Sequence, residues 1–276
     1  MATEYVWQVD KGSKVKLKDY DPDHTHSDIS RAEAEQEIQN LGEEISKLQE
    51  LLAAAHHQSM LIILQGMDTS GKDGTIRHVF SRVNPQGCYV HSFKEPTEVE
   101  LAHDFLWRVH KNAPGKGSIG IFNRSQYEDV LVARVRNLVP KSVWSARYQE
   151  INNFEKLLTN NNTIILKFFL HISYDEQAER LQARKKDKDK AWKLSASDWE
   201  TRNYWDDYQQ AYEDALSKCS TNDAPWYIVP ANRKWYRNLA VSHLIAHTMR
   251  KYKDEWQDQL EERGKQELEK LKRMKT

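Results

Sequence analysis

The stretch LIILQGMDTSGKDG, which runs from Leu61 to Gly74, decides how this chain folds. An apolar run leads into Gly66, four residues follow, and Gly71 and Lys72 then precede a helical pattern. This is the G-x-x-x-x-G-K spacing of a P-loop, with a strand before it and a helix after it. Glycines allow backbone N–H groups to surround a phosphate, and the helix N-terminus adds partial positive charge. We therefore predict a phosphate-binding loop, with an ordinary glycine-rich turn as the alternative.

The residue after the P-loop lysine departs from the standard motif. Asp73 stands where most P-loops have the Ser or Thr hydroxyl that holds Mg²⁺. A metal ion at this loop therefore needs other ligands. Asp68 lies inside the loop, so its carboxylate would face the same phosphates. We predict that Asp68 contacts a metal ion, with hydrogen bonding to loop amides as the alternative.

A second stretch, FNRSQYEDV, places polar side chains at the end of another predicted strand, Ile119–Phe122. In doubly wound sheets, ligands bind beyond the carboxyl ends of the strands, near the topological switch point. Asn123, Arg124 and Glu128 should therefore lie beside the P-loop. The Arg124 guanidinium suits bidentate phosphate contacts, with a surface ion pair as the alternative. Glu128 is predicted to contact a metal ion or its water, and a capping box with Ser125 is the competing explanation.

Short apolar runs alternate with helical patterns along the middle of the chain. The strand candidates are Met60–Leu64, Cys88–Phe93, Ile119–Phe122, Thr163–Leu170 and Trp226–Val229. Capping signals between them predict helices that start near Thr97, Ser125, Ser173 and Ser197. Strands separated by helices indicate βαβ units and a parallel sheet that is buried on both faces. The predicted fold is α/β, a P-loop kinase-like three-layer sandwich with a helical lid.

The two ends of the chain differ from this core, which we expect to span residues 57–250. Residues 1–29 are polar and predict an arm without a core of its own. A helix then begins at Ser30, where Glu33 completes a capping box, and its apolar stripe runs to Ala55. That stripe fits packing on its own domain or a subunit contact. Residues 251–276 alternate in charge and predict a solvated helix or tail.

The segment Glu179–Lys193, ERLQARKKDKDKAWK, carries seven Lys and Arg residues against three acids. Such a run is often only a solvated face. Here it follows a strand and a helix in a P-loop framework, in the place where nucleotide kinases carry a lid. A basic lid excludes water and surrounds transferring phosphates with charge. We predict a helical lid over about residues 174–218.

Bulk composition excludes several classes of protein. The 276 residues carry 41 Lys and Arg against 41 Asp and Glu, a balance that disfavours a nucleic-acid coat. Two cysteines, Cys88 and Cys219, provide neither a disulfide framework nor a four-cysteine zinc site. The apolar runs are too short for a bilayer span and no secretory signal begins the chain. We expect a cytoplasmic protein that binds neither membrane nor nucleic acid.

Several motifs together resemble the polyphosphate kinase 2 family. They are GMDTSGKDG, FNRSQYEDVLVARV, the basic segment ending in AWKLSASDW, TRNYWDDYQQAYEDAL and APWYIVPANRKWYRNLAV. The resemblance covers about residues 15–250. It implies that the P-loop and lid grip a polyphosphate chain, while a nucleotide docks opposite with its terminal phosphate facing that chain.

The resemblance also implies a role for each motif residue. The implied catalytic residues are Asp68, Lys72, Arg124 and Glu128, of which Asp68 and Glu128 are also the implied metal-associated carboxylates. The residues implied to bind nucleotide are Arg108, Asn123 and Arg124. Those implied to bind polyphosphate are Gly66, Thr69, Ser70, Gly71, Lys72, Asp73, Arg180, Arg184 and Lys185. Mg²⁺ is the implied cofactor, with Mn²⁺ as the alternative.

Within the family, FNRSxYEDV resembles the subgroup that phosphorylates both nucleoside mono- and diphosphates. We therefore expect reversible phosphoryl transfer from polyphosphate to AMP and ADP, which yields ADP and ATP, by a homo-oligomer. The lid departs from the family pattern at Lys188, where a proline is expected. Two other functions stay open. An ATP-dependent nucleotide kinase is disfavoured by Asp73 and the basic lid, and a non-catalytic polyanion-binding protein would not need Asp68 and Glu128.

Overall fold

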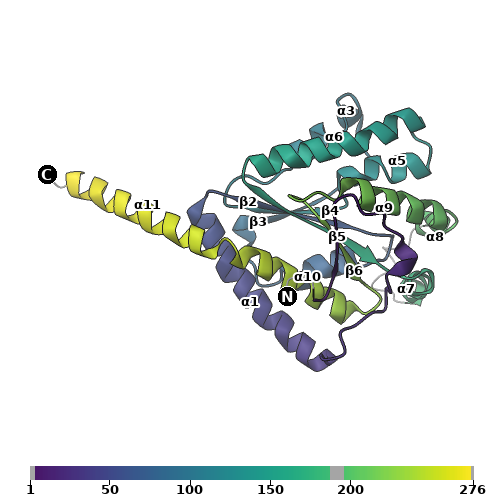
Figure 1. Ribbon diagram of the computed structural model, residues 1–276, viewed down its shortest axis with the longest axis horizontal. Helices are drawn as coiled ribbons and strands as arrows, with labels where there is room; N and C mark the ends of the chain where they lie inside the picture. Colours follow the sequence, from purple (N-terminus) through teal and green to yellow (C-terminus); the bar gives the residue numbers. More distant parts are fainter. Residues whose placement is uncertain (1–3, 187–195, 275–276) are drawn as a thin grey trace.

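A mostly parallel sheet of six strands runs through the protein (Figure 1). The computed structural model describes residues 4–186 and 196–274. In sheet order the strands are β1 (Trp7–Val9), β6 (Trp226–Pro230), β5 (Thr163–His171), β2 (Ser59–Gln65), β4 (Ile119–Asn123) and β3 (Cys88–Ser92). The strands β2 to β6 pair in parallel, which confirms the predicted α/β fold.

The sequence did not predict strand β1, which pairs antiparallel with β6 at one edge of the sheet. With three residues, β1 is too short to show an alternating pattern. The polar arm nevertheless contributes Val6, Val9, Val15 and Leu17 to the hydrophobic core. The arm is therefore packed against the domain and is held to the sheet by backbone pairing.

The central strands are apolar because helices cover both of their faces. Every residue of β2 and β5 is buried, as expected for parallel strands in the middle of such a sheet. One face carries α1 (Arg31–Ala55), α2 (Lys72–Val79) and α10 (Lys234–Arg250), and the other carries α5 (Val132–Val135), α6 (Lys141–Asn160) and α9 (Trp205–Cys219) (Figure 1). This arrangement is the predicted three-layer sandwich.

The remaining elements lie mostly near the strand ends. They are the helices α3 (Glu98–Leu101), α4 (Trp107–His110), α7 (Tyr174–Lys186) and α8 (Ala196–Arg202), and the 3₁₀ turns η1 (Leu17–Asp19), η2 (Pro85–Gly87) and η3 (Gln126–Asp129). The predicted caps at Thr97 and Ser173 are present. The helix predicted to start near Ser197 is α8, which is described from Ala196. Helices α7, α8 and α9 lie in the region predicted to form the lid.

The apolar stripe of α1 packs within its own domain. Leu41, Ile45 and Leu52 are fully buried, and α1 packs against α10 and α11 (Lys253–Met274). The Ser30 capping box is formed as predicted. Only the first turns of α11 contribute to the core, through Trp256, and the helix then extends away from the body (Figure 1). None of the helices within residues 4–186 and 196–274 is long and apolar enough to cross a membrane.

Candidate active site

The P-loop lies at the carboxyl end of β2, beside the point where the sheet order reverses. Gly66 and Gly71 have φ angles of 151° and 104°, which L-residues rarely adopt. A Cβ atom on Gly66 would lie 2.7 Å from the carbonyl oxygen of Leu170, and one on Gly71 would collide with the Arg237 guanidinium. Both glycines are therefore required by close packing as well as by backbone conformation.

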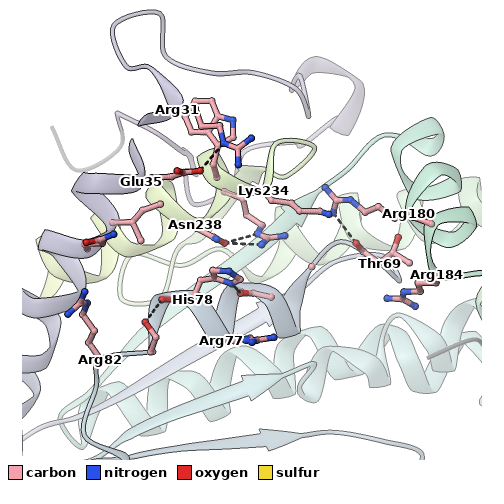
Figure 2. Close-up of a pocket in the computed structure, with 18 residues that line it drawn as sticks. Arg31, Glu35, Thr69, Arg77, His78, Arg82, Arg180, Arg184, Lys234 and Asn238 are labelled. Carbon is pink, nitrogen blue, oxygen red and sulfur yellow. Dashed lines mark hydrogen bonds and ion pairs between the residues drawn. The ribbon is translucent and has the colours of Figure 1, made fainter. Parts of the chain in front are cut away.

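Arg180 of α7 is hydrogen-bonded to the backbone of the P-loop (Figure 2). Its Nη1 donates to the carbonyl oxygens of Thr69 and Ser70 at 2.9 and 3.0 Å. Its Nη2 donates to the carbonyls of Ala231 and Asn232 after β6, and its Nε donates to a carboxylate one turn earlier in α7. All five N–H donors of the guanidinium are thus used. In this arrangement the Arg180 side chain is held by protein groups, and its predicted direct contact with polyphosphate stays a prediction.

A second guanidinium, that of Arg237 on α10, reaches the same loop. Its Nη1 donates to the carbonyl oxygen of Ser70 at 3.3 Å, and its Nη2 donates to Asn238 at 2.8 Å. Only 2% of Arg237 is exposed. Burial and the neighbouring charge of Arg180 lower the pKa of Arg237, although a guanidinium stays protonated in proteins. The two buried cations leave surplus positive charge at the loop, which favours an anion there.

Two hydroxyl groups of the P-loop are also unsatisfied. The Oγ1 of Thr69 and the Oγ of Ser70 are buried and find no hydrogen-bond partner among the described residues 4–186 and 196–274. Buried polar groups without partners are costly and uncommon. Thr69 also has a φ of 67°, in the left-handed region. Such features accumulate where a ligand supplies the missing partner, and they fit the prediction that Thr69 and Ser70 bind phosphate.

Lys72 folds back onto its own loop. Its Nζ donates to the carbonyl oxygens of Gly66 at 2.7 Å and Met67 at 3.3 Å. Burial lowers the pKa of Lys72 to about 8, and the nearby Arg124 adds to this effect. An anion placed beside this largely buried amine would favour its charged form, which fits the prediction that Lys72 binds phosphate.

The end of β4 brings the predicted polar residues to the P-loop. Arg124 has a φ of 63°, and its Nη2 donates to Asp68 Oδ1 at 2.8 Å. The Asn123 side chain donates to Asp73 Oδ1 at 2.7 Å. A non-glycine residue in the left-handed region costs free energy, and such strain is common at functional sites. The unusual backbone at Arg124 aims its guanidinium across the loop toward Asp68.

The capping-box explanation for Glu128 is wrong. Its Oε1 accepts a hydrogen bond from Gln65 Nε2 at 3.0 Å, at the end of β2. The Ser125 hydroxyl instead accepts from the backbone N–H of Tyr127 and caps the 3₁₀ turn η3. The Glu128 carboxylate is therefore held toward the P-loop side of the sheet and lines the same cavity as Asp68.

A buried ion pair lies beneath the turn that carries Glu128. Lys167 in β5 donates to Glu155 Oε2 of α6 at 2.6 Å, and both side chains are almost completely buried. Glu155 Oε1 accepts from Gln126 Nε2 at 3.0 Å and from the Tyr127 hydroxyl at 2.8 Å. Burial and the Glu155 carboxylate raise the pKa of Tyr127, so this hydroxyl keeps its proton. The ion pair thus fixes the two residues that precede Glu128.

A cavity of about 480 Å³ opens between the ends of β3 and β4 and helix α9. Its cationic side chains are Lys94, Arg108, Arg124 and Arg136, and its carboxylates include Asp68, Glu128 and Asp129. Apolar and aromatic groups from Phe93, Val132, Leu138, Tyr208 and Tyr212 line the rest. A mixture of cations and apolar surface is what a nucleotide requires, since it joins phosphates to a flat base.

Arg108 is held in this cavity by several protein groups. Its Nη1 donates to the carbonyl oxygen of Lys94 at 2.9 Å, and its guanidinium lies over the Phe93 ring. Its Nη2 is 3.9 Å from Asp129 Oδ2. Burial raises the pKa of Asp129 to about 6, although Arg147 and Arg108 oppose the rise. Arg108 is therefore fixed by protein groups, and its predicted contact with a nucleotide phosphate stays a prediction.

The residues predicted in the lid fall in different surroundings. Arg184 lines a groove on the other side of the P-loop, together with Arg180. Lys185 points elsewhere, because its Nζ lies 4.6 Å from the centre of the Trp199 ring. Lys188, where the sequence departs from the family pattern, lies outside the described residues. The predicted polyphosphate contacts of Arg184 and Lys185 stay predictions.

Lys94, Arg136, Tyr208 and Tyr212 line the cavity, and the sequence analysis did not identify them as site residues. Lys94 lies just beyond the end of β3, so the reasoning about strand ends that identified Arg124 also applied to Lys94. Arg136 does not follow a strand, so the reasoning about strand ends could not identify it. Its guanidinium carbon lies 4.4 Å from the centre of the Tyr204 ring.

A parallel sheet with a P-loop, a basic groove on one side of the loop and a nucleotide-sized cavity on the other defines a P-loop phosphotransferase. The profile of the polyphosphate kinase 2 family matches residues 28–257. This chain therefore belongs to the polyphosphate kinase 2 family, as the motifs predicted.

Individual relatives agree with the family profile. The chain is 51% identical to the AMP/ADP-polyphosphate phosphotransferase of Meiothermus ruber, over 88% of this chain and 91% of that protein. It is 49% identical to the ADP-polyphosphate phosphotransferase of Rhodopseudomonas palustris, over 82% and 83% of the two chains. The crystal structure of polyphosphate kinase 2 from Arthrobacter aurescens matches with a TM-score of 0.84 at 43% identity, covering 87% of each chain.

The buried pair beneath η3 generates a stability prediction. Lys167→Met should lower the free energy of unfolding by about 3–5 kcal/mol, because it leaves the Glu155 carboxylate buried without its cation. Urea denaturation measures this change. The matched control is Lys156→Met on α6, whose exposed partner is Asp223; an exposed pair contributes about 0–1 kcal/mol. Equal losses for the two variants would contradict the role of the buried pair.

The environment of Lys72 generates a pH prediction. The value of kcat/KM reports on the free enzyme, so it should fall as the pH rises through about 8, where Lys72 loses its proton. The kcat profile should decline at a higher pH, because a bound phosphate favours the charged amine. Above pH 8 the substrate phosphates are already ionised, so they do not obscure this limb. A kcat/KM profile that stays flat to pH 10 would rule out this assignment.

Proposed function

We propose that this protein transfers a phosphoryl group from inorganic polyphosphate to AMP and to ADP, and that it also catalyses the reverse reactions. The observation that carries this proposal is that the P-loop separates two different pockets. Gly66, Met67 and Asp68 line a cavity that mixes apolar and cationic side chains, whereas Thr69 and Gly71 line a groove whose lining includes seven Lys and Arg side chains. A donor polyanion and an acceptor nucleotide can therefore meet across one loop. The names of the relatives support the same pair of substrates.

In this proposal the protein contributes positioning and charge. Lys72, the loop amides and the N-terminus of α2 hold the phosphoryl group in transfer, while Arg124 and Arg108 hold the phosphates of the acceptor. The attacking atom is a phosphate oxygen that is already largely ionised near neutral pH, so the reaction needs no strong general base. Phosphoryl transfer depends mostly on alignment and on neutralising charge spread over the equatorial oxygens.

We further propose that Asp68 and Glu128 hold Mg²⁺, with Mn²⁺ as the alternative. Among the described residues, no group of three or more His, Cys, Asp and Glu side chains could hold a metal ion. Mg²⁺ commonly uses one or two carboxylates and completes its shell with water and substrate phosphates. Both carboxylates line the acceptor cavity and are oriented by N–H donors of Arg124 and Gln65. The metal, when bound, would neutralise charge on the phosphate oxygens.

We also expect a cytoplasmic homo-oligomer. The supporting observation is the outer part of α11, where the apolar side chains of Leu268, Leu271 and Met274 are 60%, 54% and 82% exposed. A helix that presents such side chains to solvent offers material for a subunit contact. Size-exclusion chromatography with light scattering measures the assembly state directly.

A time course with AMP, polyphosphate and Mg²⁺ tests the proposed function. ADP should appear first and ATP should follow after a lag, because each transfer adds one phosphate to the acceptor. No ATP or auxiliary kinase is present at the start. The relatives with similar identity include one named for AMP and ADP and one named for ADP alone. Reaction from ADP without reaction from AMP would therefore place this chain with the second type.

The Lys72→Ala variant provides the control for that time course. Loss of a charge beside the transferred group should reduce kcat by at least two to three orders of magnitude, roughly 3–4 kcal/mol. Thermal unfolding of the variant should stay cooperative. Near-normal turnover by the folded variant would show that the P-loop does not carry the reaction.

The metal assignment predicts a change in Mg²⁺ requirement. Asp68→Asn and Glu128→Gln should each raise the Mg²⁺ concentration for half-maximal activity by about tenfold or more, or abolish activity, because each removes an anionic ligand. The control is Glu150→Gln, an exposed carboxylate on α6. If Glu128→Gln lowers only the melting temperature and leaves the Mg²⁺ titration unchanged, Glu128 is not a metal ligand.

A further inference from the structure

The groove on the donor side of the P-loop extends well beyond the loop itself. It has a volume of about 950 Å³ and runs between α1, α2, α7 and α10. Its lining includes seven cationic side chains and a single carboxylate, Glu35; the cations are Arg31, Arg77, Arg82, Arg180, Arg184, Lys234 and Arg237. In a chain with equal numbers of acids and bases, so uneven a distribution marks this groove as a polyanion site.

The cations nearest the P-loop and those farther away differ in their surroundings. Arg180 and Arg237 are buried and bound to loop carbonyls, as described above. Arg77 is different, because its side chain forms no hydrogen bond or ion pair with the residues in the described ranges. Arg82 lies beyond α2, and its only ion pair in those ranges is with Glu43 at 3.4 Å, where both side chains are largely exposed. An exposed pair of this kind is weak and exchanges readily for a phosphate.

The position of Arg82 is set by close packing on α1. A Cβ atom on Gly42 would lie 3.2 Å from Arg82 Cδ, so the glycine makes room for the arginine stem. Arg77 lies five residues after Lys72 on α2, about 7 Å farther along the helix axis. Figure 2 shows the four cations that line the groove away from the loop: Arg31 and Lys234 in the upper part of the view, and Arg77 and Arg82 in the lower part. The cations therefore form a path that leads from the P-loop along α2 toward α1.

We propose that Arg77 and Arg82 form a distal subsite for the donor chain, which binds phosphate units several positions away from the one being transferred. The proposal rests on the proposed function, and it gives the chain a direction: away from the P-loop along α2, toward α1. It also assigns distal binding to α1 and α2, whereas the sequence placed the polyphosphate contacts only in the P-loop and the lid. A chain long enough to reach this subsite gains contacts that a short chain lacks.

The principal alternative is that these arginines serve the fold alone. Arg77 lies in the last turn of α2, where a cation interacts favourably with the helix dipole. Arg82 could act only as the partner of Glu43. In that case their removal would lower stability and would affect donors of all lengths equally. The proposal predicts the opposite, an effect that depends on chain length.

The test uses the full-length protein with Arg77→Gln, Arg82→Gln and the double variant. At saturating ADP and about 0.1 M salt, the KM of the double variant for long-chain polyphosphate should rise about tenfold. The KM for tripolyphosphate, which has too few phosphate units to reach from the P-loop to Arg82, should rise by a clearly smaller factor, and the KM for ADP should change by less than about twofold. The lysine versions, Arg77→Lys and Arg82→Lys, should recover most of the long-chain effect because they keep the charge.

Salt dependence provides a second readout. Binding of a polyanion releases condensed counterions. In single-stranded nucleic acids, each neutralised phosphate contributes about 0.7 to the slope of log affinity against log salt, and we apply the same value to polyphosphate. The slope for long-chain polyphosphate should therefore decrease by about 1.4 in the double variant. Lys265→Gln, an exposed cation on α11, is the matched control and should leave the slope unchanged.

The outcomes of these experiments distinguish a failure of the proposed function from a failure of the distal subsite. If the wild-type protein transfers no phosphate from any polyphosphate to ADP, the proposed function fails. If the wild type is active but the double variant loses long-chain and tripolyphosphate affinity equally, or loses neither, the distal subsite is overturned. A lower melting temperature with an unchanged ratio of the two KM values would show that the arginines serve only the fold.

Discussion

Hydrogen bonds from two buried guanidinium groups to the carbonyl oxygens of the P-loop are the interactions on which the rest of the site depends. Arg180 binds the carbonyls of Thr69 and Ser70, and Arg237 binds that of Ser70. These hydrogen bonds fix the direction of the two carbonyls, and with it the backbone of the loop that is expected to bind phosphate. Arg180 also binds Ala231 and Asn232, so the same side chain joins the loop, helix α7 and the end of β6. A single residue thus ties the loop geometry to the sheet.

This arrangement has an electrostatic consequence. Arg180, Arg237 and Lys72 have little exposure; burial and the charge of Arg180 lower the pKa of Arg237, and burial and the charge of Arg124 lower the pKa of Lys72. The free site therefore stores unfavourable charge, which a bound polyanion relieves. The unpartnered hydroxyls of Thr69 and Ser70 contribute in the same direction. In the proposed function, a bound polyphosphate would supply partners for these hydroxyls and a counter-charge for these cations.

Much of the fold was predictable because its signals are local. The P-loop spacing, the apolar strands and the caps at Ser30 and Thr97 each occupy a few consecutive residues, and strand ends identified Arg124 and Glu128. The parts that were missed depend on distant partners. The donors of Arg180 bind backbone carbonyls some 50 and 110 positions away, and no side-chain pattern records a carbonyl as a partner. The family resemblance therefore gave Arg180, Arg184 and Lys185 one common role, whereas the structure gives each a different environment.

The two pockets also explain how one site can serve acceptors of different length. In the proposed function, the groove would recognise repeating charge, so a polyphosphate chain could advance by one unit and meet the same contacts again. In the acceptor cavity, Arg124 stands at the loop, while Arg108, Lys94 and Arg136 line it at other points. A mono- or diphosphate can find cations in either position, provided that the base is held mainly by apolar contact with groups such as Leu138 and Val132 rather than by directional hydrogen bonds. Selectivity for length would then require a rigid base pocket. The mixture of apolar and cationic surface in this cavity instead favours recognition through phosphates, whose position is set by the loop that both substrates share.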